Sequence, residues 1–303
     1  MNSTKDDHLR RESGDEDLWF RENFRGVVSF GLRVKELIHR EQSKYQDIAV
    51  YDTYQHGRMM ALDGMVMLTE LDEPAYHEMI VHVPMQTLQN PRRALVIGGG
   101  DGGTVRELVR YPGLEEIIMV EIDEAVVNVA REHLPSLAAG LEDPRVQIIF
   151  DDGARFIKGL TPHRMDLVIV DSTDPVGPAA VLVGEEFYHD AARALAEDGV
   201  LTAQTESPLY HGPMVKDIFR NVGQAFANNF MYWAVVPAYP GSIWSFCYAS
   251  TSRHPVNDFS FTRTEGDSFK YYTPQLHKAA FAPPALALKC LPQGHPQREE
   301  NIP

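Results

Sequence analysis

The sequence predicts an α/β protein, in which a doubly wound sheet follows a small antiparallel β domain. From residue 94 onward, continuous apolar runs alternate with amphipathic segments, which is typical of parallel strands with helices on both faces. Residues 19–69 instead contain strand-like segments broken by short turn signals. The glycine-rich loop at 98–103 connects a predicted strand to a predicted helix, where such sheets bind ligands.

The predicted elements follow in chain order. The N-terminal β unit comprises GVVSFGLRV, YQDIAVYDT and RMMALDGMVMLT. A helical period begins at Tyr76 and places Met79, Val83 and Leu88 near one face. The predicted parallel strands are 94–98, 115–122, 145–150, 165–171 and 199–205, with helices at 104–111, 124–134, 153–160, 185–195 and 212–226, and an edge hairpin at 231–240 and 243–250. These elements indicate a mobile polar tail over 1–17, a β domain over 18–75, a Rossmann-like domain over 76–290 and a frayed C-terminal tail over 291–303.

Composition limits the class of protein. The 303 residues are 44% hydrophobic and 23% charged, as in ordinary globular proteins. With 28 basic and 43 acidic residues the net charge is −15, which argues against nucleic acid and anionic membranes as partners. Only Cys247 and Cys290 are present, and the N-terminus has no apolar core, so we expect a cytoplasmic protein. The histidines and cysteines lack metal-site spacing, so we expect no metal.

The glycine loop indicates a nucleoside ligand. Gly98, Gly100 and Gly103 fit G-x-G-x-x-G between a strand and a helix. The next strand ends at Glu121, where a carboxylate typically binds ribose hydroxyls. We therefore expect an adenosine-type ligand, although a tight turn for close helix packing would give the same pattern.

Acidic residues end or follow all five predicted parallel strands. Like charges at one rim destabilise one another unless a cation binds there, so they predict a cationic ligand, although single acids often cap helices. Asp101 would repel the diphosphate of a dinucleotide, so the loop favours an S-adenosyl sulfonium compound over a nicotinamide cofactor. The residues concerned are Asp101, Glu121, Asp151, Asp152, Asp171, Asp174 and Glu206.

The segment STDPVGPAAVLVG follows the fourth parallel strand. Its prolines and glycines suggest a lid that closes over the site, with Asp171 and Asp174 at its base. An ordinary connecting loop is the alternative.

These motifs together resemble the spermidine synthases, the polyamine aminopropyltransferase family, and in particular its bacterial members. The resemblance extends from Trp19 to Pro284. It is carried by ALDGMVMLTELDEPAYHEM, LVIGGGDGGTVREL, MVEID, DPRV, DDGARF, VDSTDPVGPA, QTES, PAYPGSIWSF and YYTPQLHKAAF.

The resemblance implies a methyltransferase-like catalytic domain. It also implies transfer of an aminopropyl group from decarboxylated S-adenosylmethionine, a co-substrate, to a diamine, usually putrescine, without a cofactor. The products would be spermidine and 5′-methylthioadenosine, and the chain would form a homodimer or homotetramer.

The resemblance also assigns site residues. Asp171 would be the general base, because an acceptor ammonium with a pKa near 10 must lose a proton before it attacks. Asp174 would hold the acceptor. The donor site would comprise Gln46, His77, Gly98, Gly100, Asp101, Glu121, Asp152, Gly153 and Pro178, and the acceptor site Tyr76, Asp171, Asp174, Gln204 and Tyr239.

Three departures leave the acceptor open. Met67, Pro74 and Ala238 replace residues that many relatives carry near the acceptor side. Cadaverine, agmatine or spermidine could replace putrescine, and a methyltransferase that uses S-adenosylmethionine is the enzymatic alternative. An inactive module that binds a polyamine or a nucleoside is the alternative outside enzymes.

Overall fold

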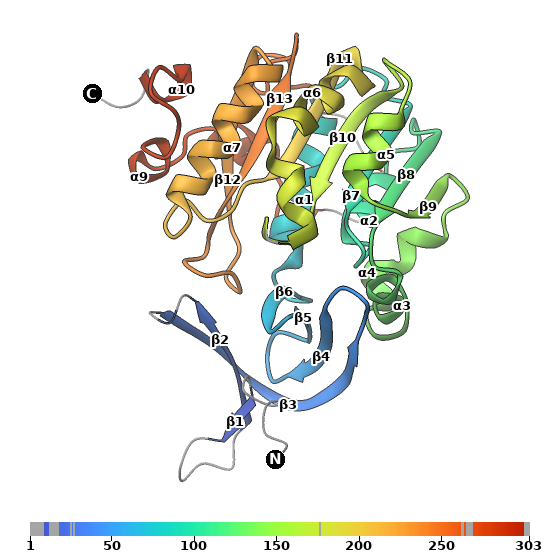
Figure 1. Ribbon diagram of the computed structural model, residues 1–303, viewed down its shortest axis with the longest axis vertical. Coiled ribbons are helices and arrows are strands. Elements are labelled where there is room, and N and C mark those ends of the chain that lie inside the picture. The colour runs from blue at the N-terminus through green and yellow to red at the C-terminus, as the bar shows by residue number, and fades with distance from the viewer. Residues whose placement is uncertain are drawn as a thin grey trace.

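A computed structural model describes residues 9–11, 18–24, 26, 28–175, 177–261, 264 and 269–299. A six-stranded antiparallel sheet lies below a larger α/β domain (Figure 1). Its strands follow one another in chain order, each paired with the next. They are β1 (Leu9–Arg11), β2 (Leu18–Phe24), β3 (Val28–Gln42), β4 (Asp47–Thr53), β5 (Arg58–Leu62) and β6 (Met65–Thr69).

The predicted polar tail is wrong for part of its length. Leu9–Arg11 forms β1, whose backbone pairs antiparallel with β2. The rest of that predicted tail, 1–8 and 12–17, lies outside the described residues. Strand β3 also exceeds the predicted segment, because its charged second half pairs with β4 after its first half has paired with β2.

The second sheet has seven strands in the order β12-β13-β11-β10-β7-β8-β9. Strands β7 to β11 are parallel, and the predicted edge hairpin is present as β12 and β13, which run antiparallel to their neighbours. The order reverses between β7 and β10, as in a doubly wound sheet. The strands are β7 (Arg93–Gly98), β8 (Glu116–Glu121), β9 (Val146–Phe150), β10 (Met165–Asp171), β11 (Leu195–Gln204), β12 (Asn228–Val235) and β13 (Ile243–Ser250).

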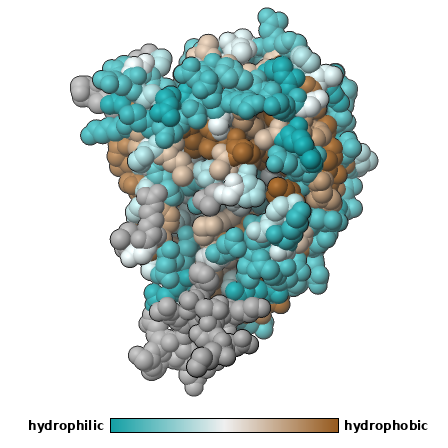
Figure 2. Space-filling view, in the orientation of Figure 1, coloured by the Kyte–Doolittle hydropathy of each residue, from teal (hydrophilic) through white to brown (hydrophobic). Residues whose placement is uncertain are grey.

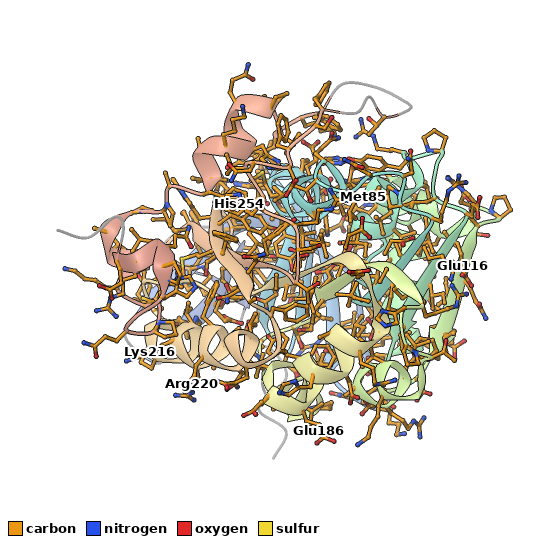
Figure 3. The ribbon with its side chains drawn as sticks, turned by 90° about the horizontal axis from the view of Figure 1, so that it is seen from above. Met85, Glu116, Glu186, Lys216, Arg220 and His254 are labelled. Atoms are coloured by element: carbon orange, nitrogen blue, oxygen red, sulfur yellow. The ribbon has the colours of Figure 1, made fainter. Side chains whose placement is uncertain are left out.

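Helices cover both faces of this sheet, so its central strands are buried on both sides. Along β7, Val96 belongs to one buried cluster while Leu95 and Ile97 belong to the other. Figure 3 shows Lys216 and Arg220 projecting outward from the helical layer, and both are exposed. The helices within and beside the sheet are α2 (Gly103–Val109), α3 (Glu124–His133), α4 (Pro135–Ala138), α5 (Gly153–Gly159), α6 (Glu185–Ala194) and α7 (Gly212–Ala225), with 3₁₀ turns at Ala139–Glu142 and Gly177–Val183.

Helix α1 (Glu73–Met85) differs from the predicted amphipathic helix, because all of its residues are buried. It starts three residues earlier than predicted and packs on α2, β10 and β11. Its remaining side is covered by the chain at 270–272, whose three backbone N–H groups donate to the Glu78 carboxylate. A helix with a polar residue satisfied in this way can be buried on every side.

The C-terminal residues are also more ordered than predicted. Three short helices follow the hairpin: α8 (Pro274–Ala280), α9 (Ala285–Leu288) and α10 (Pro296–Glu299). Gln297 is buried, and its amide bonds both backbone polar groups of Met231 in β12. The expected frayed tail over 291–303 is therefore wrong as far as Glu299, and 300–303 lie outside the described residues.

The surface seen in Figure 2 is mixed. Polar residues cover its upper rim, and apolar residues gather below that rim. Across the described residues, no helix combines the length and apolar character that crossing a bilayer requires.

Candidate active site

A cavity of about 550 Å³ lies at the carboxyl ends of the parallel strands, where the strand order reverses. Residues from the N-terminal sheet form part of its wall, so both domains contribute. All but one of the predicted site residues line it. They are Gln46, Tyr76, His77, Gly98, Gly100, Asp101, Glu121, Asp152, Gly153, Asp171, Asp174, Pro178 and Tyr239.

The glycine loop is shaped by close approach of two strand ends. Gly98 has a φ of +84°, and a Cβ there would lie 2.1 Å from the carbonyl oxygen of Asp171. Gly99 donates its N–H to that carbonyl at 2.8 Å. Only glycine permits both the positive φ and the contact, so the loop fixes the backbone of β7 against the end of β10.

Asp101 in this loop is paired within the protein. Its Oδ1 lies 3.3 Å from Nε2 of His77 and accepts the N–H of Gly103 at 2.7 Å. Burial alone would lower the pKa of His77, but Asp101 and Glu73 outweigh burial and raise this pKa to about 10. The imidazole is therefore an imidazolium at neutral pH. Burial would raise the pKa of Asp101, but His77 outweighs burial and lowers it.

The Asp171 carboxylate is fixed by two hydroxyl groups. Tyr76 donates to Oδ1 at 2.7 Å, and Thr104 of α2 donates to Oδ2 at 2.6 Å. Burial and the nearby Asp101 raise the pKa of Asp171. Burial also raises the pKa of Tyr76 well above its usual value, so Tyr76 stays a donor. A positioned carboxylate of raised pKa is suited to accept a proton.

Glu121 ends β8 at the side of the cavity that the glycine loop forms. Its Oε1 accepts the N–H of Asp123 at 2.9 Å, and burial raises its pKa to about 7. Asp123 in turn accepts hydrogen bonds from Ser43 at 2.6 Å and from the Gln46 amide at 3.0 Å. The turn between β3 and β4 is thereby held against this side of the cavity.

The two acids that follow the third parallel strand, Asp151 and Asp152, make different contacts. Asp152 lines the cavity, and its side chain also caps α5 by accepting the N–H of Arg155 at 2.9 Å. Asp151 is not among the lining residues and is ion-paired with the Arg155 guanidinium. The end of the third strand therefore contributes Asp152 to the rim of the cavity, whereas Asp151 lies outside the lining.

A smaller cavity of about 50 Å³ adjoins the first beyond Asp174. Gln204, the predicted residue missing from the larger cavity, lines it. Met67 lines both cavities, and its carbonyl accepts the Tyr239 hydroxyl at 2.6 Å. The other two departures, Pro74 and Ala238, are buried and are absent from the described lining of both cavities.

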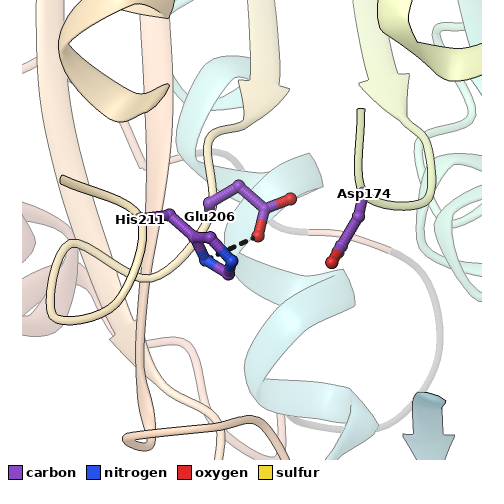
Figure 4. A group of neighbouring side chains, drawn as sticks. All are labelled: Asp174, Glu206 and His211. Atoms are coloured by element: carbon purple, nitrogen blue, oxygen red, sulfur yellow. Dashed lines mark ion pairs between the residues drawn. The ribbon is translucent and has the colours of Figure 1, made fainter. Parts of the chain in front are cut away.

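Sequence analysis missed two residues near Asp174. Asp174, Glu206 and His211 lie together with ligand atoms within 4.8 Å of one another (Figure 4). His211 is ion-paired with Glu206, Nδ1 to Oε2, at 3.1 Å. These residue types could bind a metal, but their separations along the sequence match no metal-binding motif, so sequence analysis did not find the group. Glu206 had been noted only as a strand-end acid.

Glu22 of β2 is a third missed residue. It lines the smaller cavity and is buried, and its carboxylate accepts the N–H of Val66 at 2.9 Å. Burial raises the pKa of Glu22 to about 7. It comes from a strand that the apolar pattern did not single out, so sequence analysis gave no signal for it.

The predicted lid lies over the larger cavity. Residues 172–174 and 177–179 line the cavity wall, and so do Val181 and Leu182 of the 3₁₀ turn Gly177–Val183. Val176 lies outside the described residues. Any movement of this segment remains a prediction.

Comparison with known proteins agrees with this architecture. Residues 73–260 match the spermine/spermidine synthase domain, and residues 18–70 match the spermidine synthase tetramerisation domain. The polyamine aminopropyltransferase of Thermoanaerobacter sp. (strain X514) is 44% identical over 270 residues, covering 88% of this chain and 96% of that protein. The enzyme of the same name from Moorella thermoacetica is 43% identical over 283 residues, covering 93% and 99%.

A solved structure is similar across both domains. A crystal structure of spermidine synthase in complex with the transition state analogue AdoDATO superposes with a TM-score of 0.88 at 36% identity, covering 93% of this chain and 97% of that one. The chain therefore belongs to the spermine/spermidine synthase family of aminopropyltransferases.

Proposed function

We propose that the protein transfers the aminopropyl group of decarboxylated S-adenosylmethionine to putrescine, with Asp171 as general base. The observation that carries the proposal is the Asp171 carboxylate, which two hydroxyls orient beside a nucleoside-sized cavity. The bound transition state analogue in the similar spermidine synthase supports the substrate class.

The donor would occupy the side of the cavity formed by the glycine loop. Glu121 would bind the ribose hydroxyls, and Gly98 lets the backbone approach the nucleoside. Asp101 would bind the ammonium of the aminopropyl arm and orient the arm for attack. Its pairing with His77 supports this role, because the imidazolium holds Asp101 in its ionised form.

The acceptor would enter between Tyr76 and Asp174. An ammonium placed at Asp171 would lose a proton to that carboxylate, whose raised pKa makes it the stronger base. The freed amine attacks the methylene next to sulfur. A C–N bond forms, the C–S bond electrons return to sulfur, and neutral 5′-methylthioadenosine leaves.

The far ammonium of the acceptor would be bound by Asp174, with Glu22 and Glu206 nearby. These carboxylates belong to three different segments that surround the smaller cavity or Asp174. Because Met67 lines both cavities, its side chain would contact the middle of the acceptor. An amine of another length, such as cadaverine, is the alternative acceptor.

The match to a tetramerisation domain supports a homo-oligomer, and we infer a tetramer. Light scattering on the purified protein tests this state.

The acceptor is tested by supplying decarboxylated S-adenosylmethionine with a panel of amines and identifying products by mass spectrometry. We expect spermidine and 5′-methylthioadenosine with putrescine as the best acceptor. A different preferred amine would overturn the acceptor assignment alone. Formation of S-adenosylhomocysteine from S-adenosylmethionine, without aminopropyl transfer, would overturn the reaction.

A further inference from the structure

Helix α1 carries two buried histidines, each of which is paired with a glutamate, Glu73 of α1 itself and Glu107 of α2. His77 contacts Glu73, Nδ1 to Oε2, at 2.7 Å, and His82 contacts Glu107, Nε2 to Oε2, at 3.0 Å. Arg106 of α2 binds both glutamates, through its two terminal nitrogens to Glu73 and through Nε to Glu107. Only the first pair continues into the cavity, because His77 also contacts Asp101.

The second pair, His82 and Glu107, does not reach the cavity. The other nitrogen of His82 contacts the Tyr111 hydroxyl at 2.8 Å, and its ring packs 4.3 Å from that of Phe269. None of these residues is among the described residues that line the cavity. Burial lowers the pKa of His82, even beside Glu107. The two pairs thus shift the pKa values of their histidines in opposite directions.

We propose that Glu73, supported by Arg106, is a positioning residue that holds His77 as an imidazolium and thereby fixes Asp101 for the donor's ammonium. Carboxylates face both ring nitrogens of His77, so both nitrogens must donate. The inference rests on the proposed donor role of Asp101.

The geometry shows how Glu73 acts at a distance. Its own carboxylate is buried and does not line the cavity, so it would not touch the donor. His77 and the Gly103 N–H both bond Oδ1 of Asp101, and neither contact uses Oδ2. The ring cannot move toward the loop, because Gly103 packs so closely that a Cβ there would lie 2.3 Å from Cε1 of His77. Asp101 is thus held with Oδ2 left for the donor.

The test is Glu73→Gln, which keeps the shape of the side chain and removes its charge. His77 would then keep only one carboxylate partner, Asp101, so its pKa would fall and the imidazolium that makes the charge-assisted contact with Asp101 would be less stable. Among the described residues, Asp171 also acts on His77, Arg106 acts on both of its carboxylate partners, and the Tyr76 ring packs against His77 edge-on. We expect the donor KM to rise about 10- to 100-fold, as for loss of a charge-assisted bond, with the acceptor KM unchanged.

The pH profile distinguishes this role from a merely structural one. In the wild type, His77 stays charged up to about pH 9 and should add no pH dependence to the donor KM below that pH. Glu121, whose pKa burial raises to about 7, titrates in both proteins and cancels in the ratio of their donor KM values. In Glu73→Gln the donor KM relative to the wild type should begin to rise at a lower pH than about 9, because His77 has lost one of the two carboxylates that raise its pKa. Glu73→Asp, which restores the charge, should recover part of the loss.

Glu107→Gln is the matched control. It removes a buried carboxylate from the same arginine and from a second α1 histidine, and should leave the donor KM within about twofold. Equal effects of Glu73→Gln and Glu107→Gln would overturn the proposal, and so would an unchanged donor KM in Glu73→Gln.

Two further measurements keep the inference testable if Glu73→Gln does not fold. The His77 ring signal in the wild type, assigned with His77→Asn, should report an imidazolium at pH 8 by NMR, and a neutral ring would overturn the proposal. Calorimetry of donor binding to Asp101→Ala tests the donor role of Asp101 separately from the positioning role of Glu73. Unchanged affinity there would remove the donor role of Asp101, whereas weakened affinity with a normal Glu73→Gln would remove only the role of Glu73.

Discussion

The proposed donor and acceptor sides of the cavity carry their negative charge in different surroundings. On the donor side, Asp101 is ion-paired with the His77 imidazolium before any substrate binds. On the acceptor side, Asp171 accepts hydrogen bonds from neutral hydroxyls, and burial raises its pKa. The proposed donor side therefore has an acid that is already ion-paired, whereas the proposed acceptor side keeps a carboxylate that an incoming ammonium would stabilise.

The largest expected effect is on catalysis at the acceptor side. Asp171→Asn should lower turnover by about 10²- to 10⁴-fold, the usual loss for a general base, while donor affinity changes little. Steady-state kinetics and calorimetry measure the two quantities. Asp166→Asn, at the opposite end of β10, is the control and should keep turnover near wild type. A few-fold loss in Asp171→Asn would contradict the assigned role.

The next effect tests the rigidity of the donor side. In Gly98→Ala, the alanine would have to adopt the positive φ of Gly98, and its Cβ would clash with the Asp171 carbonyl. The substitution should therefore lower the free energy of unfolding by about 2 to 6 kcal/mol. Gly159→Ala is the control, because a Cβ there meets nothing within 4 Å. Denaturant unfolding compares the two variants. Equal stability would show that the loop can relax and that the donor side is not rigid.

Asp101→Ala should chiefly affect donor binding. We expect the donor dissociation constant to rise about 10- to 100-fold, since a charged hydrogen-bonding partner is lost. Asp151→Ala removes an acid that also follows a parallel strand but lies outside the cavity, and it should bind the donor normally. Calorimetry measures the dissociation constants. Identical values for the two variants would show that Asp101 matters no more for donor binding than Asp151.

The smallest effect is a pH dependence of stability at the acceptor side. The pKa of Glu22 rises from 4.5 to about 7 on folding, so the folded state binds more protons between these values. Its contribution to stability is fully present below pH 4.5 and is lost as the pH rises through about 7. Glu22→Gln should remove this part of the slope in the unfolding free energy. If the unfolding free energy of Glu22→Gln depends on pH as that of the wild type does, other groups cause the pH dependence.

The sequence predicted the parallel domain well, because each of its strands contains a short apolar run, and a glycine or an acid ends the strand or follows it within two residues. The predicted helices that alternate with these parallel strands have both ends within two residues of those observed. The ends of the strands were therefore predicted correctly, and so was the position of four acids at those ends: Asp101, Glu121, Asp171 and Asp174.

Sequence reasoning failed where tertiary contacts replace local pattern. Helix α1 is buried all round because Glu78 is satisfied by backbone from residues 270–272, far away in the chain. Strand β1 depends on its pairing with β2, and Glu22 enters the smaller cavity only because β2 belongs to the N-terminal sheet. Likewise, the imidazolium state of His77 follows from two carboxylates brought together by folding.

The amide of Gln297 has a consequence for solubility. Strand β12 ends the order of the catalytic sheet, and an edge strand offers unpaired backbone groups to other chains. By occupying both polar groups of Met231, Gln297 blocks part of that edge. A chain truncated after Pro292 should therefore self-associate through β12, which concentration-dependent light scattering would detect.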